Sequence, residues 1–130
     1  MKNSKGSLLV SARVYAYRKA PELPVQVSVS PEFLDMSDIA EGAITIEWKL
    51  VTRGYKFPDD GTAIVFTSPG SKEAFGPTDV TSKAKLKSIN KTATVKVLAR
   101  TGLAYAYTIT VIDESTGLTA VLDPGAQLPS

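Results

Sequence analysis

The chain has 130 residues, contains neither histidine nor cysteine, and carries a formal net charge of +2. The missing side chains exclude Ser-His-Asp and Cys-His catalytic groups within the chain, and they are the ligands of nearly all structural zinc sites. The small net charge does not by itself indicate a nucleic-acid-binding protein. This length suits a single folded domain, so we expect one domain over residues 1–130 with short flexible ends near residues 1–6 and 125–130.

The N-terminal segment is basic and leads into the apolar residues Leu8, Leu9 and Val10. Polar residues such as Ser11 and Arg13 interrupt that run at once, and no small-residue cleavage motif follows, which argues against a secretory signal. No stretch approaches the roughly 18 apolar residues of a membrane helix. We therefore expect a cytoplasmic protein without membrane contact, or a periplasmic or secreted one whose export signal has been removed.

Apolar and polar residues alternate along most of the chain, with the period of two that is typical of half-buried strands. The first such run carries on its apolar face Leu8, Val10, Ala12, Val14 and Ala16. Its opposite face carries Ser11, Arg13, Tyr15 and Tyr17. Further candidate strands follow in chain order at residues 25–29, 44–50, 64–66, 84–89, 95–97, 105–111 and 118–122.

Turn-forming residues separate these runs at short, regular intervals. The clearest turns are Pro58-Asp59-Asp60-Gly61, Ser68-Pro69-Gly70-Ser71 and Glu114-Ser115-Thr116-Gly117. Only residues 31–40 allow a helical turn, and their apolar spacing is poor. Short strands at this pitch predict an all-β fold, specifically a β-sandwich of about seven to nine antiparallel strands.

Two details favour an immunoglobulin-like β-sandwich. Trp48 lies mid-strand on the same face as Ile46, and the core of such domains uses a central tryptophan. Near the other end, Tyr105 and Tyr107 resemble the tyrosine corner at the entry to the penultimate strand, and a buried tyrosine needs a partner for its hydroxyl. We expect the core to be built on Trp48, Ile46, Val27, Tyr107, Ile109 and Val111.

Several motifs spread over the chain point to a known family. They are Trp48, the segment Gly54-Tyr55-Lys56-Phe57-Pro58-Asp59-Asp60-Gly61, and Tyr105-x-Tyr107 leading to Asp123-Pro124. On these motifs the whole chain resembles the DP-EP family, a small group of bacterial immunoglobulin-like proteins with no known activity. The resemblance implies an immunoglobulin-like fold and brings no catalytic residues to carry over.

Basic residues gather between Lys83 and Arg100, a segment without acidic residues. Lys83, Lys85 and Lys87 are two apart, so on a strand they project from one face as a ladder. This lysine ladder is either a docking surface for an acidic partner or a strand protected against unwanted pairing. No aromatic residue is interleaved with the cations, which argues against a single-stranded nucleic acid as the partner.

Aromatic residues give two further candidate contact surfaces. Tyr15 and Tyr17 share the polar face of the first strand, and Tyr55 and Phe57 lie in the loop 54–61. Aromatic anchors of this kind are typical of interfaces. In the alternative interpretation, the first pair faces a second layer of the sandwich and Phe57 fills one end of the core.

The acidic residues do not form a motif that identifies a metal or catalytic site. Glu32, Asp35, Asp38 and Glu41 cluster before the Trp48 strand, and Asp59 and Asp60 lie in a turn. They lack the spacing of a calcium-binding loop, so turn capping explains them better. We expect no metal, no cofactor and no catalytic residues.

We therefore predict a non-catalytic protein-binding or assembly module and not an enzyme. Its expected partner is another protein or a second copy of the chain, and neither nucleic acid nor a membrane. The candidate contact residues are Tyr15, Tyr17, Tyr55, Phe57, Lys83, Lys85 and Lys87. The alternative is a carbohydrate- or small-ligand-binding module that uses the loop 54–61. An enzyme working through carboxylates, tyrosine or lysine alone would require a concave pocket.

Overall fold

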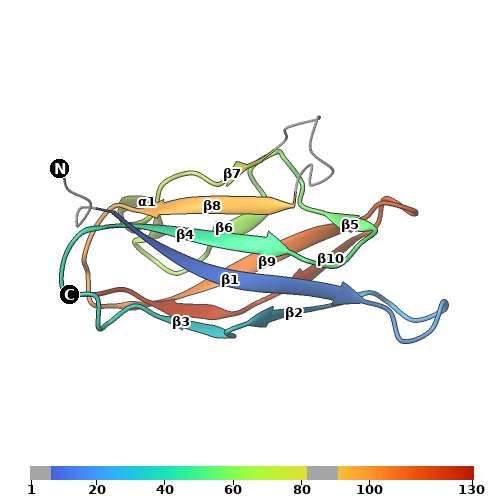
Figure 1. Cartoon of the computed structure of the whole chain (residues 1–130), viewed down its shortest axis with the longest axis horizontal. Coiled ribbons are helices and arrows are strands. Elements are labelled where there is room, and N and C mark those ends of the chain that lie inside the picture. Colours follow the sequence, from blue (N-terminus) through green and yellow to red (C-terminus); the bar gives the residue numbers. More distant parts are fainter. Residues whose placement is uncertain (1–6, 82–90) are drawn as a thin grey trace.

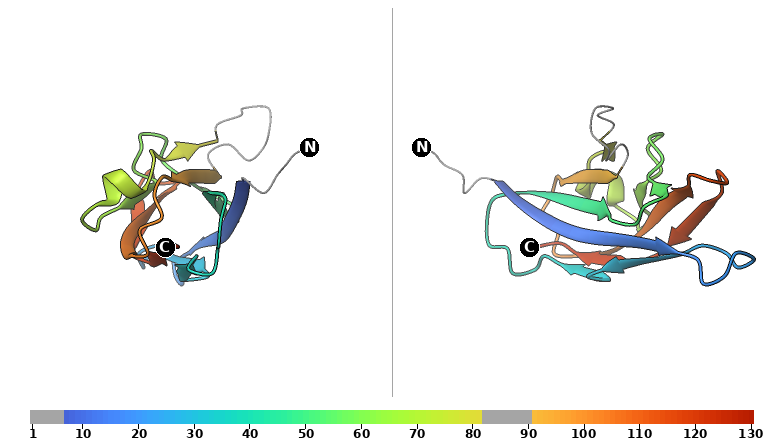
Figure 2. Two further views of the ribbon diagram at one scale, coloured as in Figure 1. Left: turned by 90° about the vertical axis from the view of Figure 1, so that its left-hand side faces the viewer. Right: turned by 45° about the vertical axis from the view of Figure 1, so that its right-hand side comes forward.

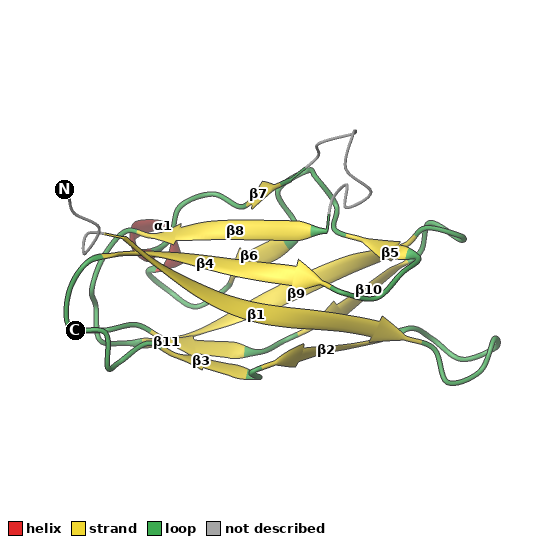
Figure 3. Cartoon of the chain, in the orientation of Figure 1, coloured by secondary structure: helices red, strands yellow, loops and turns green. Residues whose placement is uncertain are grey.

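Strands are the main secondary structure of the described residues. The computed structural model describes residues 7–81 and 91–130, and this part of the chain is mostly β (Figure 3). Its one helical element is the single turn α1 (Ser71–Ala74). The expected all-β class is therefore confirmed.

The first sheet has the strand order β2-β1-β4-β8-β7. The long β1 (Ser7–Tyr17) lies inside this sheet, between β2 (Gln26–Ser30) and β4 (Ala43–Leu50). Beyond β4 come β8 (Thr92–Val97) and the short β7 (Asp79–Val80). Figure 1 shows β1 running beside β4 along most of the length of the molecule.

The second sheet is organised around β9 (Ala104–Asp113), with which four other strands pair. One flank of β9 pairs with β10 (Thr119–Leu122) and β11 (Gly125–Gln127), and the other flank pairs with two short strands. The two short strands are β5 (Tyr55–Lys56) and β6 (Ile64–Phe66). A further strand, β3 (Phe33–Asp35), pairs with β11 and forms the edge of the sheet on that side.

Both sheets contain a parallel pair, which corrects the expectation of antiparallel strands throughout. β1 runs parallel to β4, and β11 runs parallel to β3. Alternation tells which face a side chain takes, but it carries no information about strand direction. The described residues also form eleven strands instead of seven to nine. Several are short because prolines, which cannot donate to a ladder, divide β2 from β3 at Pro31 and β10 from β11 at Pro124.

The helical turn expected within residues 31–40 does not form. Leu34 and Met36 are buried there while Phe33 and Asp35 are exposed, which is a period of two. Backbone pairing with β11 continues past the strand, because the Met36 N–H donates to the carbonyl of Gln127 at 2.9 Å. The sheet therefore outweighs the weak helical preference of this segment, and the one helical turn lies at α1 instead.

The flexible C-terminal end expected at residues 125–130 is also corrected. β11 pairs with both β9 and β3, and Leu128 and Pro129 behind it are fully buried. Gly125 allows this docking, because a Cβ at that position would lie 3.2 Å from the ring of Phe33. The expected flexible end at residues 1–6 lies outside the described residues.

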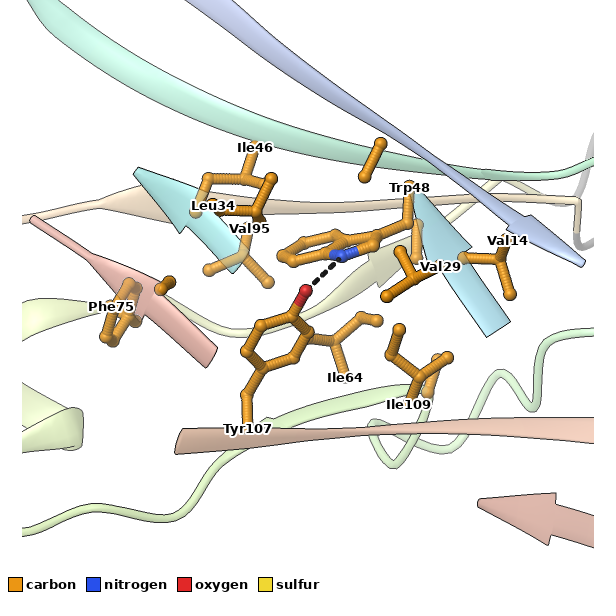
Figure 4. Packing of buried hydrophobic residues seen from close by; sticks show 14 of the residues in the cluster. Val14, Val29, Leu34, Ile46, Trp48, Ile64, Phe75, Val95, Tyr107 and Ile109 are labelled. Carbon is orange, nitrogen blue, oxygen red and sulfur yellow. Dashed lines mark hydrogen bonds between the residues drawn. The ribbon is translucent and has the colours of Figure 1, made fainter. Parts of the chain in front are cut away.

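Apolar side chains from the two sheets meet in one core, and Figure 2 shows the two layers from further directions. Every residue expected to build this core is buried, and the set comprises Val27, Ile46, Trp48, Tyr107, Ile109 and Val111. Their prediction from alternation is confirmed. Figure 4 shows part of this core, in which Val95 of β8 and Tyr107 and Ile109 of β9 gather around Trp48 of β4.

A hydrogen bond links the two sheets at the centre of the core. The Trp48 indole Nε1 donates to the Tyr107 hydroxyl at 3.1 Å (Figure 4), and the two rings lie 5.5 Å apart between centroids. Burial raises the pKa of Tyr107 to about 12, against the smaller lowering effect of the bond from Trp48. Nearby, the Tyr105 hydroxyl donates to Thr101 Oγ1 at 3.0 Å. Both tyrosines therefore have the hydroxyl partner that was expected.

Candidate functional site

The outer face of β1 presents two tyrosines to solvent. Alternation sends Ala12, Val14 and Ala16 into the core, so the residues between them must point outward. Tyr15 is 37% exposed and Tyr17 is 44% exposed. No further layer of the described chain covers them, so the interpretation in which they face a second layer is not the observed one.

Cross-strand neighbours extend this surface over three strands. Tyr15 lies opposite Ser28 of β2, and Tyr17 lies opposite Gln26. Arg13 lies between Ser30 of β2 and Lys49 of β4. Polar side chains of β2 therefore lie beside the tyrosines, and positive charge lies one pair further along the strand. We call the outward-facing residues Arg13, Tyr15, Tyr17 and Lys49 the β1 outer face.

One acidic residue interrupts the positive charge of this sheet. Glu47 accepts a hydrogen bond from the Ser11 hydroxyl at 3.2 Å and lies 3.8 Å from the Lys49 ammonium. Exposed pairs of this kind contribute little to stability. They do keep the outer face polar and mixed in charge, which suits a hydrated contact surface.

The two aromatic residues of the loop 54–61 have different environments. Phe57 is 0% exposed and belongs to the hydrophobic core, so it is removed from the candidate contact surface. Tyr55, in β5, is half-buried. Of the two aromatic residues predicted to contact a partner, only Tyr55 is accessible. Phe57 instead fills part of the core, as the alternative interpretation of the sequence proposed.

Tyr55 lines an open hollow together with the end of β1. The hollow has a volume of about 560 Å³ and is bordered by Arg18, Arg53, Gly54, Tyr55, Asp113, Glu114 and Ser115. Gly54 has a φ of +85°, a left-handed conformation that glycine adopts without a Cβ penalty. This turn brings β5 back onto β9, and so places Tyr55 beside the chain that leaves β1.

An ion pair between two of the residues that border this hollow connects the end of β1 to β9. Arg18 Nη2 donates to Asp113 Oδ2 at 2.8 Å. The other carboxylate oxygen accepts from the Ser115 hydroxyl at 2.7 Å and from the Ser115 N–H at 2.9 Å. These bonds from Ser115, with Arg18, hold the pKa of Asp113 below its usual value. Asp113 is therefore ionised at neutral pH and is not suited to be a general acid.

The lysine ladder of Lys83, Lys85 and Lys87 lies outside the described residues. The rest of the basic run is described and has mixed roles. Lys91 donates to the carbonyls of Thr52 and Tyr55, and burial lowers its pKa while Glu114 opposes that shift.

Arg100 has a similar role at another loop. Its guanidinium donates to the carbonyls of Ile39 at 2.8 Å and Gly42 at 3.1 Å. Lys96, in contrast, is exposed on β8. Two of these three cations therefore hold loops in place, and the run is not a uniform docking stripe.

Several loop carboxylates cap their own turns, as expected. Asp35 accepts from the Ser37 hydroxyl at 2.6 Å, and Asp60 accepts from the Thr62 hydroxyl and, at 3.1 Å, from the Thr62 N–H. These hydrogen bonds lower the pKa of both aspartates. No group of three or more acidic side chains within the described ranges is arranged to hold a metal ion.

The Arg18–Asp113 pair and its hollow were not found from the sequence. The two residues lie 95 positions apart, and no periodic pattern connects them. The available local signal was the Asp-x-Ser spacing of Asp113 and Ser115, which marks a capped turn but says nothing of a distant arginine.

The search against known protein families and the curated proteins gives no match to this chain. Within the part that the structure describes, no helix has the length and apolar character needed to cross a membrane.

Proposed function

We propose that this chain is a non-catalytic protein-binding or assembly module on an immunoglobulin-like β-sandwich, and that the β1 outer face is its contact surface. The observation that carries the proposal is the exposure of Tyr15 and Tyr17 on a strand inside a sheet. At these two residues β1 pairs with β2, and on the other side the Ala16 N–H between them donates to the Thr52 hydroxyl at 3.0 Å, so the backbone that presents the rings is held in place. Aromatic anchors with polar groups beside them are typical of protein interfaces.

Strand order supports the immunoglobulin-like part of the proposal. Immunoglobulin domains have sheets A-B-E-D and C-F-G. If β1 is left out of the first sheet, the remaining order is β2-β4-β8-β7. These four strands then correspond to A, B, E and D, respectively. In the second sheet, β9 takes the place of F, between β5 and β6 on one flank and β10 and β11 on the other.

Residues at the centre of the sandwich also fit that architecture. Tyr105 lies near the start of β9 and its hydroxyl bonds to the Thr101 side chain four residues upstream, where the hydroxyl of a tyrosine corner bonds to the backbone. Two residues on, where antibody domains have the second cysteine of a disulfide between B and F, Tyr107 bonds to Trp48 of β4. Trp48 therefore takes the place of the first cysteine, and not that of the strand-C tryptophan. The proposed likeness to the DP-EP family depends on these residues together with the segment 54–61 and Asp123-Pro124.

The test compares the two outer faces of the molecule. The variant Tyr15→Ala/Tyr17→Ala removes both anchors, while Thr108→Ala/Thr110→Ala changes two outward-facing residues of β9 as a matched control. Affinity capture from lysate of the source cells, read by mass spectrometry, should lose a specific protein in the first variant and keep it in the second. Equal capture by wild type and both variants would end the proposal for this face.

A second candidate function is the binding of a carbohydrate or another small polar ligand. The hollow beside Tyr55 favours it, because an aromatic ring and two arginines, Arg18 and Arg53, border one concave surface. Titration of a glycan panel should then change tyrosine fluorescence in the wild type and not in Tyr55→Ala. An unchanged signal in the wild type across the panel would exclude this function.

A further inference from the structure

β1 occupies an unusual place for the first strand of a chain. It is inserted between β2 and β4, antiparallel to the first and parallel to the second. Its only covalent connection to the described body is the segment 18–25, which projects from the end of the molecule (Figure 1).

The residues of β1 fix its register between β2 and β4. Trp48 is paired with Ala12 of β1 on one side and with Ala93 of β8 on the other, and all three are buried. Two alanines thus make room for the largest core side chain. A shift by one residue would reverse the faces of β1, and a shift by two would bring Val10 or Val14 against the indole, where an overpacked core is destabilised.

Removal of β1 would leave a slot of about 10 Å between β2 and β4, which is two strand spacings. Both walls of the slot would expose unpaired backbone groups and apolar side chains, among them Val27 and Val29 of β2 and Leu50 of β4. The strand that fits this slot has alternating apolar residues with alanine opposite Trp48. A second copy of the chain carries that strand.

The connection 18–25 holds the closed arrangement by few contacts of its own. Arg18 Nη1 donates to the carbonyls of Pro21 at 3.3 Å and Leu23 at 3.0 Å, and the Leu23 N–H donates to the carbonyl of Ala20 at 2.9 Å. Most of the segment is exposed. Its prolines, Pro21 and Pro24, favour extended backbone, so extension of this hinge costs less conformational freedom than it would in a glycine-rich loop.

We infer that β1 exchanges between two copies of the chain, so that each copy inserts its β1 between β2 and β4 of the other. In the exchanged dimer all core contacts of β1 are remade, and Arg18 meets Asp113 of the other copy. The hydrogen bonds within the hinge, from Arg18 to Pro21 and Leu23 and from Leu23 to Ala20, are given up. Exchange of an identical element is a low-cost route to a dimer for this reason. The inference names a partner for the assembly function proposed above and rests on that proposal.

The chain has no cysteine, so an engineered cysteine pair reports strand pairing without interference. Arg13→Cys/Ser30→Cys places thiols on directly paired residues of β1 and β2, and antiparallel partners lie within the Cα distance that a disulfide needs. Thr45→Cys/Lys96→Cys is the matched control, because it joins β4 to β8, which stay together in one chain. Each variant is unfolded under reducing conditions, refolded at low and at high protein concentration, oxidised, and run on a non-reducing gel.

The β1–β2 pair should give a disulfide-linked dimer whose share rises with concentration during refolding, while the control pair gives monomer only. Monomer alone from the β1–β2 pair at every concentration would overturn the exchange, and so would equal dimer from both pairs. These results leave the binding test on Tyr15 and Tyr17 unaffected, so the two proposals fail separately.

A hinge variant supplies a second test that leaves the sheets untouched. Pro21→Gly/Pro24→Gly makes the connection 18–25 more flexible and so favours closure within one chain. Sedimentation after concentrated refolding should show a several-fold lower dimer fraction than in the wild type. A dimer fraction equal to or above that of the wild type would contradict the role of the hinge.

Discussion

Two strands of this protein contain the same tripeptide, Tyr-Ala-Tyr, and place it with opposite faces inward. In β1, Ala16 is buried while Tyr15 and Tyr17 are exposed. In β9, Tyr105 and Tyr107 are buried while Ala106 is exposed.

The difference comes from the residues that continue each strand. In β1 the buried residues Ala12 and Val14 lie on the same face of the strand as Ala16. In β9 the buried residues Ile109 and Val111 lie on the same face as the two tyrosines. Because side chains alternate strictly along a strand, the longer series of apolar residues decides which side chains of the tripeptide point into the core. The same residues thus serve as core in one strand and as a candidate contact surface in the other.

The largest effect should come from truncating an inward tyrosine. Tyr107→Ala leaves a cavity beside Trp48 and removes the hydroxyl that accepts the indole N–H, so we expect a loss of about 3–5 kcal/mol in the free energy of unfolding. Denaturant unfolding of this variant and of Tyr15→Ala measures the comparison directly. A loss of similar size in both variants would show that the two tripeptides are not used differently.

Alkaline pH should destabilise the fold through the same residue. The folded-state pKa of Tyr107 is about 12, above its unfolded value near 10, so the unfolded chain releases this proton first. The contribution of the protonated Tyr107 to the free energy of unfolding is fully present below pH 10. It is lost as the pH rises toward 12, by about 3 kcal/mol in total. Tyr107→Phe should lack this component of the pH dependence, and an identical fall in wild type and variant would assign it elsewhere.

At neutral pH the bond between the sheets can be tested alone. Tyr107→Phe keeps the ring but leaves the buried Trp48 N–H without this acceptor, at an expected cost of about 1–3 kcal/mol. Tyr105→Phe should cost less, because its partner Thr101 is exposed and can bond to water. The reverse order, from unfolding curves of the two variants, would mean that the Trp48–Tyr107 bond contributes little.

The smallest effect on stability should come from the outward tyrosines. Tyr15→Ala and Tyr17→Ala remove exposed rings, and surface substitutions of this kind change stability by roughly 0.5 kcal/mol or less. Thermal unfolding checks each variant before any binding measurement. A loss above about 2 kcal/mol would mark these residues as structural and remove the basis of the proposed contact surface.

Alternation was enough to predict the faces of β1, β4 and β9 and the residues of the core, because each depends on a local pattern. The direction of β1 and its insertion beside β4 depend on pairing between distant segments, which local patterns do not contain. The burial of Phe57 and the Arg18–Asp113 pair likewise arise where separate strands end at one place. Of the candidate site, the outward tyrosines could therefore be predicted, and the hollow beside them could not.

The most direct test of the β1 outer face is photo-crosslinking from a single position on each sheet. A benzophenone side chain placed at Tyr17 reports on that face, and one placed at Thr110 of β9 reports on the opposite side of the molecule. Irradiation in the source cells should give a specific crosslinked protein, or a second copy of the chain, from position 17 and none from position 110. Crosslinks from position 110 alone, or from neither position, would contradict the assignment of the contact surface.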